Sequence, residues 1–317
     1  MVNFKYIKVI PGSNKSKFPN CTSLLIDDGD IVALIDPGAG QETLLNATGN
    51  CRVNFLINTH YHFDHISGNY LFPNAQLFIN SIEIDCFPNL KQVAKLLGIE
   101  EIYGEEGALD WIKRVSAPHS PQTKFSPSNR HEWWMSTRFS ASPYSYDCEW
   151  NIGKVRVIMI HTPGHTSGFC CPYFPDEGLV YTGDIDLTNF GPWYAGSDGS
   201  IKQFIASAYR IAQLDADWFL TGHQVGMISK AEFISKLDQY IDIIHKRHKR
   251  LNNLLERGVQ PKDVHQYGLL YSPEYQVDPW IYMWERITIR KHLELNSSME
   301  KSDKLFKNNQ DLLINGK

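Results

Sequence analysis

Four polar side chains, those of His60, His62, Asp64 and His65, stand within six positions of the chain, in the stretch NTHYHFDHISGN. They directly follow the apolar run from Val53 to Ile57, which predicts a buried strand that ends here. A packed core does not hold such a cluster without partners, because an unpaired buried polar group is costly. The cluster must therefore lie at a strand end, where other groups or a ligand can pair with it.

Three further polar residues occupy the same kind of position later in the chain. His165 follows the strand predicted over 154–160, Asp184 ends the strand LVYTGD, and His223 ends the short strand DWFLTGH. In α/β folds, functional groups gather where strands give way to loops. We therefore expect these seven side chains to converge at one edge of a sheet.

Imidazoles with a few carboxylates suit zinc, iron, manganese or cobalt, and the absence of thiolates argues against a structural zinc site. Seven ligands are too many for one tetrahedral ion, but they fit two ions bridged by a carboxylate and a solvent molecule. We predict that the site binds two divalent metal ions. Zinc is the expected metal, and iron or manganese are the alternatives. A non-specific histidine tract is the simpler alternative, but such tracts seldom have partners a hundred residues away.

The order of the predicted elements indicates an α/β protein. Strands over 22–26 and 31–35 flank the turn DDGD, and further strands alternate with helices. The capping box SKAE, from Ser229 to Glu232, opens a long helix that Gly258 ends.

Two domains are expected. A catalytic domain covers residues 1–228, and residues 229–317 form a long helix, a small helical domain and a polar tail. Within the first domain, residues from about 99 to 150 lack clear periodicity but hold four tryptophans, so we expect an ordered insertion. It would form a lid over the site, or pack as a small subdomain.

The composition excludes several classes of protein. The net charge of −4 and the pI near 6.3 give no overall basic field for nucleic acid. The sequence contains no run of about 18 apolar residues, so no membrane-spanning helix is expected. The N-terminus lacks the pattern of a signal peptide. The six cysteines show no CxxC spacing, which favours reduced thiols and a cytoplasmic location.

The stretch THYHFDH resembles the HxHxDH motif of the metallo-β-lactamase superfamily. HTPGHTSG, YTGDIDL and LTGHQ follow in the family's order, and DPG at Asp36 is similar to its first motif. The resemblance covers roughly residues 20 to 228. It implies a four-layer αββα sandwich with the metals at one edge. The segment after it resembles, more loosely, the small helical, winged-helix-like appendage of some relatives.

The resemblance also implies a role for each matching residue. It places the first ion on His60, His62 and His165, and the second on Asp64, His65 and His223, with Asp184 as the bridge. Asp36 would support the loops, and His161 matches a position that binds no metal. Asp186 would help to support the loop of Asp184.

The predicted chemistry is hydrolysis by a metal-activated hydroxide, with Asp64 as the catalytic residue that orients the hydroxide and accepts its proton. The commonest subclass of true β-lactamases has a cysteine where Asp184 stands, which argues against penicillin hydrolysis. An ester or thioester is the leading substrate. A phosphodiester or RNA, and a lactone, are the alternatives. A flavodiiron-like redox role is more distant, because no electron-donor domain follows.

Trp193 and Tyr194, soon after Asp184, are predicted to line the substrate cleft, although aromatic residues also pack in cores. The expected partner is a small molecule. The basic run HKRHKR, from His245 to Arg250, leaves RNA contact open, but a solvated helix face is the simpler interpretation. A homodimer is possible by analogy with relatives, and no membrane contact is expected.

Overall fold

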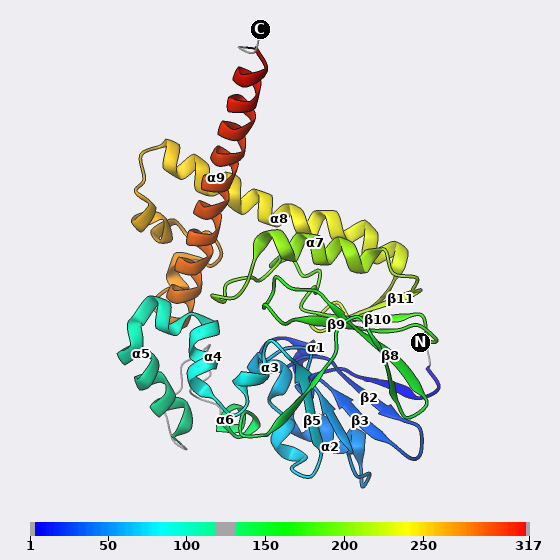
Figure 1. Cartoon of the computed structure of the whole chain (residues 1–317). Helices are drawn as coiled ribbons and strands as arrows, with labels where there is room; N and C mark the ends of the chain where they lie inside the picture. The colour runs from blue at the N-terminus through cyan, green and yellow to red at the C-terminus, as the bar shows by residue number, and fades with distance from the viewer. Residues whose placement is uncertain (1–3, 118–130, 315–317) are drawn as a thin grey trace. The chain divides into compact units, whose positions relative to one another are not determined.

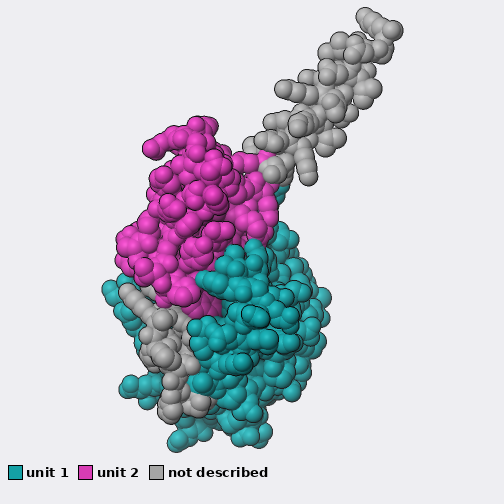
Figure 2. Space-filling view, turned by 90° about the vertical axis from the view of Figure 1, so that its left-hand side faces the viewer, with its two compact units in different colours: residues 1–244 teal, residues 245–317 magenta. Residues whose placement is uncertain are grey.

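The computed structural model describes residues 4–117 and 131–314 of the chain. Its contacts divide the chain into two compact units, residues 1–244 and 245–317 (Figure 2). The first unit holds two six-stranded sheets with helices on their outer faces (Figure 1).

The first sheet is mixed: β1 to β3 are antiparallel, and β4 to β6 continue parallel to β3. Its strands, in spatial order, are β1 (Ile7–Ile10), β2 (Ser23–Asp27), β3 (Val32–Ile35), β4 (Phe55–Ile57), β5 (Gln76–Asn80) and β6 (Ala141–Tyr144). All four residues of β3 are buried, as expected for a strand covered on both faces.

The second sheet is antiparallel except for the pair β10 and β11. Its strands, in spatial order, are β12 (Met227–Ser229), β11 (Trp218–Thr221), β10 (Leu179–Gly183), β9 (Cys170–Phe174), β8 (Val155–His161) and β7 (Glu149–Ile152). Aliphatic and aromatic side chains from both sheets form one core between them, among them Ile26, Ile35, Val157 and Phe174.

Helices complete the four layers. The helix α2 (Gln41–Thr48) lies over the first sheet, while α7 (Ile201–Ala212) and the first part of α8 (Lys230–Glu256) lie over the second (Figure 1). Phe233 of α8 stacks on Phe219 of β11 with ring centroids 4.3 Å apart. Ser200 caps α7 by accepting a hydrogen bond from the Gln203 N–H at 3.4 Å. The predicted αββα class is confirmed.

The predicted aromatic-rich insertion at about 99–150 is in part scaffold. Its last strands, β6 and β7, are each an edge strand of one of the two sheets. Trp150 packs in the core region, with its ring 5.0 Å from that of Phe78. Before these strands come α4 (Leu90–Leu97), α5 (Ile99–Ser116) and α6 (His131–Ser136), and residues 118–130 of the segment lie outside the described residues.

The division between the units falls inside α8, at residues 244 and 245, and not at the predicted 228/229. The reason is that the first part of α8 packs on the first unit. Phe233, Leu237 and Ile241 are buried, and the Tyr240 hydroxyl donates to the Asp184 carbonyl oxygen at 3.2 Å.

The second unit is helical, as predicted. It contains the end of α8, the short helices η4 (Pro261–Tyr267) and η5 (Pro273–Tyr275), and α9 (Pro279–Ile314). A small core includes Leu251, Val264 and Ile289. A winged-helix domain also contains strands, and residues 245–314 form none. The second unit therefore resembles such a domain only in being helical.

The basic run in this unit is partly internal. Arg247 is buried, and Arg250 donates to the Tyr267 carbonyl. Among the described residues, no helix is long and apolar enough to cross a membrane.

Candidate metal centre

The seven predicted ligands converge at one edge of the sandwich, because each follows a strand of one sheet or the other. The first four come just after β4, two of them in the short helix α3 (Phe63–Ile66). His165 lies between β8 and β9, Asp184 directly follows β10, and His223 follows β11. None of the seven side chains belongs to a residue that exposes more than 9% of its surface.

The side chains form two groups, and in each group the candidate ligand atoms lie within 4.8 Å of one another. The first group contains His60, His62, His165 and Asp184, and the second contains Asp64, His65 and His223. The structure therefore brings together all seven residues, in the grouping that the sequence resemblance implies.

Asp184 lies between the two groups. Its Oδ2 is 2.6 Å from His165 Nε2 and 3.3 Å from His60 Nε2. Its Oδ1 is 3.1 Å from His65 Nε2 and 2.9 Å from His223 Nε2. One oxygen faces each group, which is the arrangement that a bridging carboxylate requires.

Hydrogen bonds fix which nitrogen of these histidines faces the centre. His165 Nδ1 lies 2.9 Å from the Trp193 carbonyl oxygen, and His223 Nδ1 lies 2.7 Å from that of Ser16. A carbonyl oxygen only accepts, so Nδ1 carries the proton in both rings. His65 Nδ1 contacts the Asp36 carboxylate at 2.8 Å in the same way. In the neutral rings, Nε2 is then left with a lone pair that points into the centre.

These lone pairs face one another, and that arrangement fits a cation. His62 Nδ1 lies 2.9 Å from His165 Nε2, and His65 Nε2 lies 3.4 Å from His223 Nε2. His60 Nε2 is buried and has no hydrogen-bond partner. Two such nitrogens held this close repel each other unless a proton or a metal cation lies between them. The donor set, with imidazole nitrogens and carboxylate oxygens, is that of a binuclear metal site.

The electrostatics of the metal-free site favour the ligating form in His60 and Asp184 but not in every ligand. Burial and the neighbouring His65 lower the pKa of His60 to about 4, so its ring is neutral at pH 7. Burial alone would raise the pKa of Asp184, but the facing histidines hold it well below its usual value. Burial would lower the pKa of His65, His165 and His223, but the facing Asp184 carboxylate raises all three, that of His223 to about 9. A cation would take the place of these protons. Neutral imidazole and ionised carboxylate are the ligating forms.

Asp36 supports two of the ligand-bearing segments. Its carboxylate accepts hydrogen bonds from the Thr59 N–H at 2.8 Å and the Thr59 hydroxyl at 2.7 Å, beside its contact with His65. Two residues later, Gly38 permits a close approach, since an added Cβ would lie 1.7 Å from the Asp64 carbonyl oxygen. The motif DPG thus places the first loop directly against α3.

The two aromatic residues predicted to line the cleft differ in position. Tyr194 is fully buried, so its ring is part of the interior and does not line an open cleft. Trp193 is only partly buried, and its ring centroid lies 5.2 Å from that of His62 and 5.3 Å from that of His165. His161, the position expected to bind no metal, contacts the Ser167 carbonyl oxygen through Nε2 at 3.0 Å.

Two buried or partly buried carboxylates were not predicted from the sequence. Glu83, which is fully buried, accepts from the Thr166 hydroxyl and, at 3.0 Å, from the Gly168 N–H, so it holds the loop that follows His165. Asp198 accepts from the Ser167 N–H at 3.1 Å. Burial and the charge of Asp198 raise the pKa of Glu83 to about 7. Neither carboxylate belongs to a recognisable motif.

Comparison with known proteins agrees with this geometry. The family model described as the metallo-beta-lactamase superfamily matches residues 17–78 and 151–223, which include every candidate ligand. A hydroxyacylglutathione hydrolase from Pelagibacter ubique is 25% identical over 76% of this chain and 81% of its own length. An uncharacterized protein from Aquifex aeolicus is 27% identical over 56% of this chain and 70% of its own.

A solved structure of a metallo-beta-lactamase family protein from Thermus thermophilus has the same fold. Its TM-score is 0.62 at 18% identity, with 94% of this chain and 95% of that chain covered. A beta-lactamase domain protein from Burkholderia ambifaria matches with a TM-score of 0.53 at 13% identity, over 93% and 88% of the two chains. Motifs, sheet order and site geometry agree with the family match, and the chain belongs to the metallo-beta-lactamase superfamily.

Proposed function

We propose that this metallo-hydrolase binds two divalent cations, with zinc as the expected metal, and that it cleaves an ester or thioester of a small organic acid. The observation that carries the proposal is the position of Asp184, whose two oxygens each face one complete group of ligands. When bound, such ions lower the pKa of water toward neutrality and polarise a carbonyl oxygen.

The candidate ligands have different proposed roles. The first ion would be held by His60, His62 and His165. The second ion would be held by Asp64, His65 and His223, and Asp184 would contact both ions. Asp64 has its Oδ2 3.5 Å from His223 Nε2, and its carboxylate is the proposed acceptor of the proton that the nucleophile loses. The ring of Trp193, beside the first group, is the proposed contact for the acyl part of the substrate.

The choice of bond rests on the relative from Pelagibacter ubique, whose name describes removal of a hydroxyacyl group from glutathione. At 25% identity this likeness supports acyl hydrolysis as a class. A thioester is therefore the first substrate class to test, before esters, lactones and phosphodiesters.

The test joins metal analysis to a substrate panel. We expect two equivalents of metal per chain and a preference above about 100-fold in kcat/KM for thioesters over lactones and phosphodiesters, equivalent to about 2.7 kcal/mol. The variant His62→Ala should lose the first metal equivalent and the activity. The variant His245→Ala, at an exposed position of the second unit, should keep both. A preference for phosphodiesters would instead identify a nuclease-like enzyme.

A further inference from the structure

An unusual turn lies next to the second group of ligands. The segment Ser13–Ser16, labelled α1, contains three successive residues with positive φ: Asn14 at 53°, Lys15 at 56° and Ser16 at 53°. For residues other than glycine, this left-handed conformation costs roughly 1–2 kcal/mol each. Asn tolerates it best. A run of three persists only where the surrounding structure holds it in place.

Hydrogen bonds around Ser16 hold this turn. The Ser16 hydroxyl accepts from the Gly12 N–H at 2.8 Å and lies 2.9 Å from the Thr22 hydroxyl. The Ser16 N–H donates to the Gly12 carbonyl at 3.0 Å, and the Thr22 N–H donates to that of Gly222 at 2.7 Å. The turn is therefore fastened to the residue that directly precedes His223.

The turn presents one group to the metal centre. The Ser16 carbonyl oxygen is 2.7 Å from His223 Nδ1, and Ser16 is buried. This contact keeps the proton on Nδ1 and leaves Nε2, which lies 2.9 Å from Asp184 Oδ1, as the ligating atom. The direction of that carbonyl depends on the backbone conformation of the turn.

We propose that Ser16 is a positioning residue for His223, and that the left-handed turn Asn14–Ser16 sets the affinity of the second metal-binding group. The inference rests on the proposed metal binding, and it adds a backbone carbonyl of a segment far along the chain from the ligand motifs to the groups that orient the ligands. The strain of the turn is retained because the resulting carbonyl orients a ligand.

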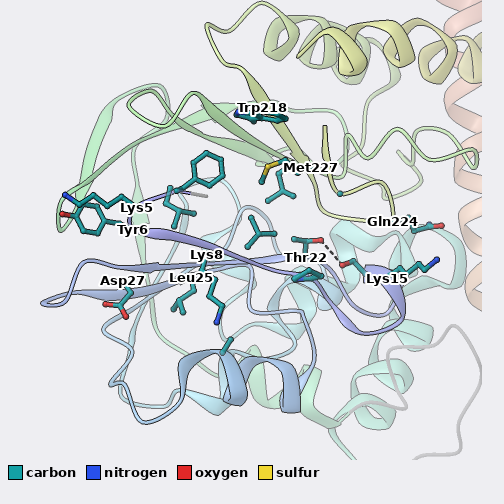
Figure 3. Close-up of a pocket in the computed structure, with 18 residues that line it drawn as sticks. Lys5, Tyr6, Lys8, Lys15, Thr22, Leu25, Asp27, Trp218, Gln224 and Met227 are labelled. Atoms are coloured by element: carbon teal, nitrogen blue, oxygen red, sulfur yellow. Dashed lines mark hydrogen bonds between the residues drawn. The ribbon is translucent and has the colours of Figure 1, made fainter. Parts of the chain in front are cut away.

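Lys15 offers a matched pair of variants. Its side chain is exposed and lines the end of a groove of about 1200 Å³ along β1, near Thr22 and Gln224 (Figure 3). The variants Lys15→Gly and Lys15→Val remove the same charge. Glycine adopts a positive φ freely, whereas the β-branched valine strongly disfavours it.

The first measurement is a titration of the metal-free full chain with Zn²⁺ in competition with a chelator. We expect Lys15→Val to weaken the second equivalent by about 10–100-fold and to leave the first unchanged. Lys15→Gly should bind both equivalents as the wild type does. Equal behaviour of the two variants, or equal loss at both equivalents, would overturn the proposal.

The second measurement needs no metal. Proton NMR of the metal-free chain should show a slowly exchanging His223 Nδ1–H, held by the Ser16 carbonyl, in the wild type and in Lys15→Gly, and a rapidly exchanging one in Lys15→Val. If the wild type binds fewer than two ions, the proposed function fails, but this spectrum still decides the role of the turn. An equally slow exchange of this Nδ1–H in Lys15→Val overturns that role.

If Lys15→Val does not fold, Ser16→Ala takes its place. This variant loses the hydroxyl that contacts Gly12 and Thr22 but keeps the carbonyl. We expect the second Zn²⁺ equivalent to weaken and the first to remain. Two unchanged equivalents, or two equally weakened ones, would show that the turn has only a structural role.

Discussion

Asp184 differs from the other six candidate ligands because it faces both groups. His62 belongs to the first group alone. At the scale of single residues, these two side chains therefore separate the contributions of the two groups.

We expect Asp184→Ala to lower the affinity for both metal equivalents. His62→Ala should lower the affinity for the first equivalent only. Each variant should reduce kcat/KM by more than about 100-fold. Loss of a residue that only supports a ligand typically costs about 10–100-fold in activity, and loss of the ligand itself should cost more. Elemental analysis after dialysis measures the stoichiometry. Full metal content with wild-type turnover in either variant would remove that residue from the site.

Glu83 predicts a pH dependence of stability. Its pKa is raised from 4.5 to about 7 in the folded chain, by burial first and by Asp198 second. Below the unfolded pKa both states are protonated, and this contribution to stability is fully present. Between pH 4.5 and about 7 only the unfolded chain releases the proton, so up to about 3 kcal/mol is lost as the pH rises.

The variant Glu83→Gln should lack this dependence. Urea unfolding of the metal-free wild type and variant, at several pH values from 4 to 8, measures the difference between them. A constant difference across that range would show that the pKa of Glu83 is not raised.

The ligands could be predicted at this scale because histidine and aspartate stand out in short motifs. Asp36, which contacts His65, could also be predicted because it lies in the DPG motif, but the backbone partners of the ligands could not. The Ser16 and Trp193 carbonyls that orient His223 and His165 are backbone atoms, which any residue supplies. Their roles depend on chain direction and tertiary contact.

At the scale of elements, a buried strand such as β3 could be predicted, because its continuous aliphatic run indicates it. The outer strands β1, β6, β7 and β12 were not. These strands are short and partly exposed, and β6 contains Pro143. Proline is tolerated at a sheet edge, but in a sequence it argues against a strand.

The packing of α8 on the first unit leads to a prediction for Tyr240. Its buried hydroxyl donates to the Asp184 carbonyl. We expect Tyr240→Phe to lower the free energy of unfolding by about 1 kcal/mol, because a buried acceptor loses its donor. The metal stoichiometry should stay at two.

Tyr209→Phe is the matched control, since its hydroxyl donates to Asp238 at an exposed position. Its effect should stay within about 0.5 kcal/mol. Chemical unfolding measures both variants. Equal effects would mean that the Tyr240 hydrogen bond contributes no more than a surface contact.

At the scale of the whole molecule, the two units differ in their predicted response to metal. Among the described residues, both groups of candidate ligands lie in the first unit. The general α/β architecture followed from the order of the elements. The boundary inside α8 did not, because a continuous helix gives no sequence signal where its packing partner changes.

We expect metal to stabilise the first unit selectively. At a free concentration 1,000 times Kd, a bound ion adds about 4 kcal/mol. In calorimetry of the full chain, Zn²⁺ should raise the Tm of the transition assigned to residues 1–244. A second transition, from residues 245–317, should not move. A single transition that shifts as one would show that the units unfold together.

The wide spacing of the ligands has a consequence for biosynthesis. The first group is complete once Asp184 has left the ribosome, but the second lacks His223 until 39 further residues have been added. A nascent chain can therefore acquire its full complement of metal only after β11 has joined its sheet. Full metal loading thus reports that the chain has folded as far as β11, and a product terminated before His223 would leave the ribosome without a complete centre.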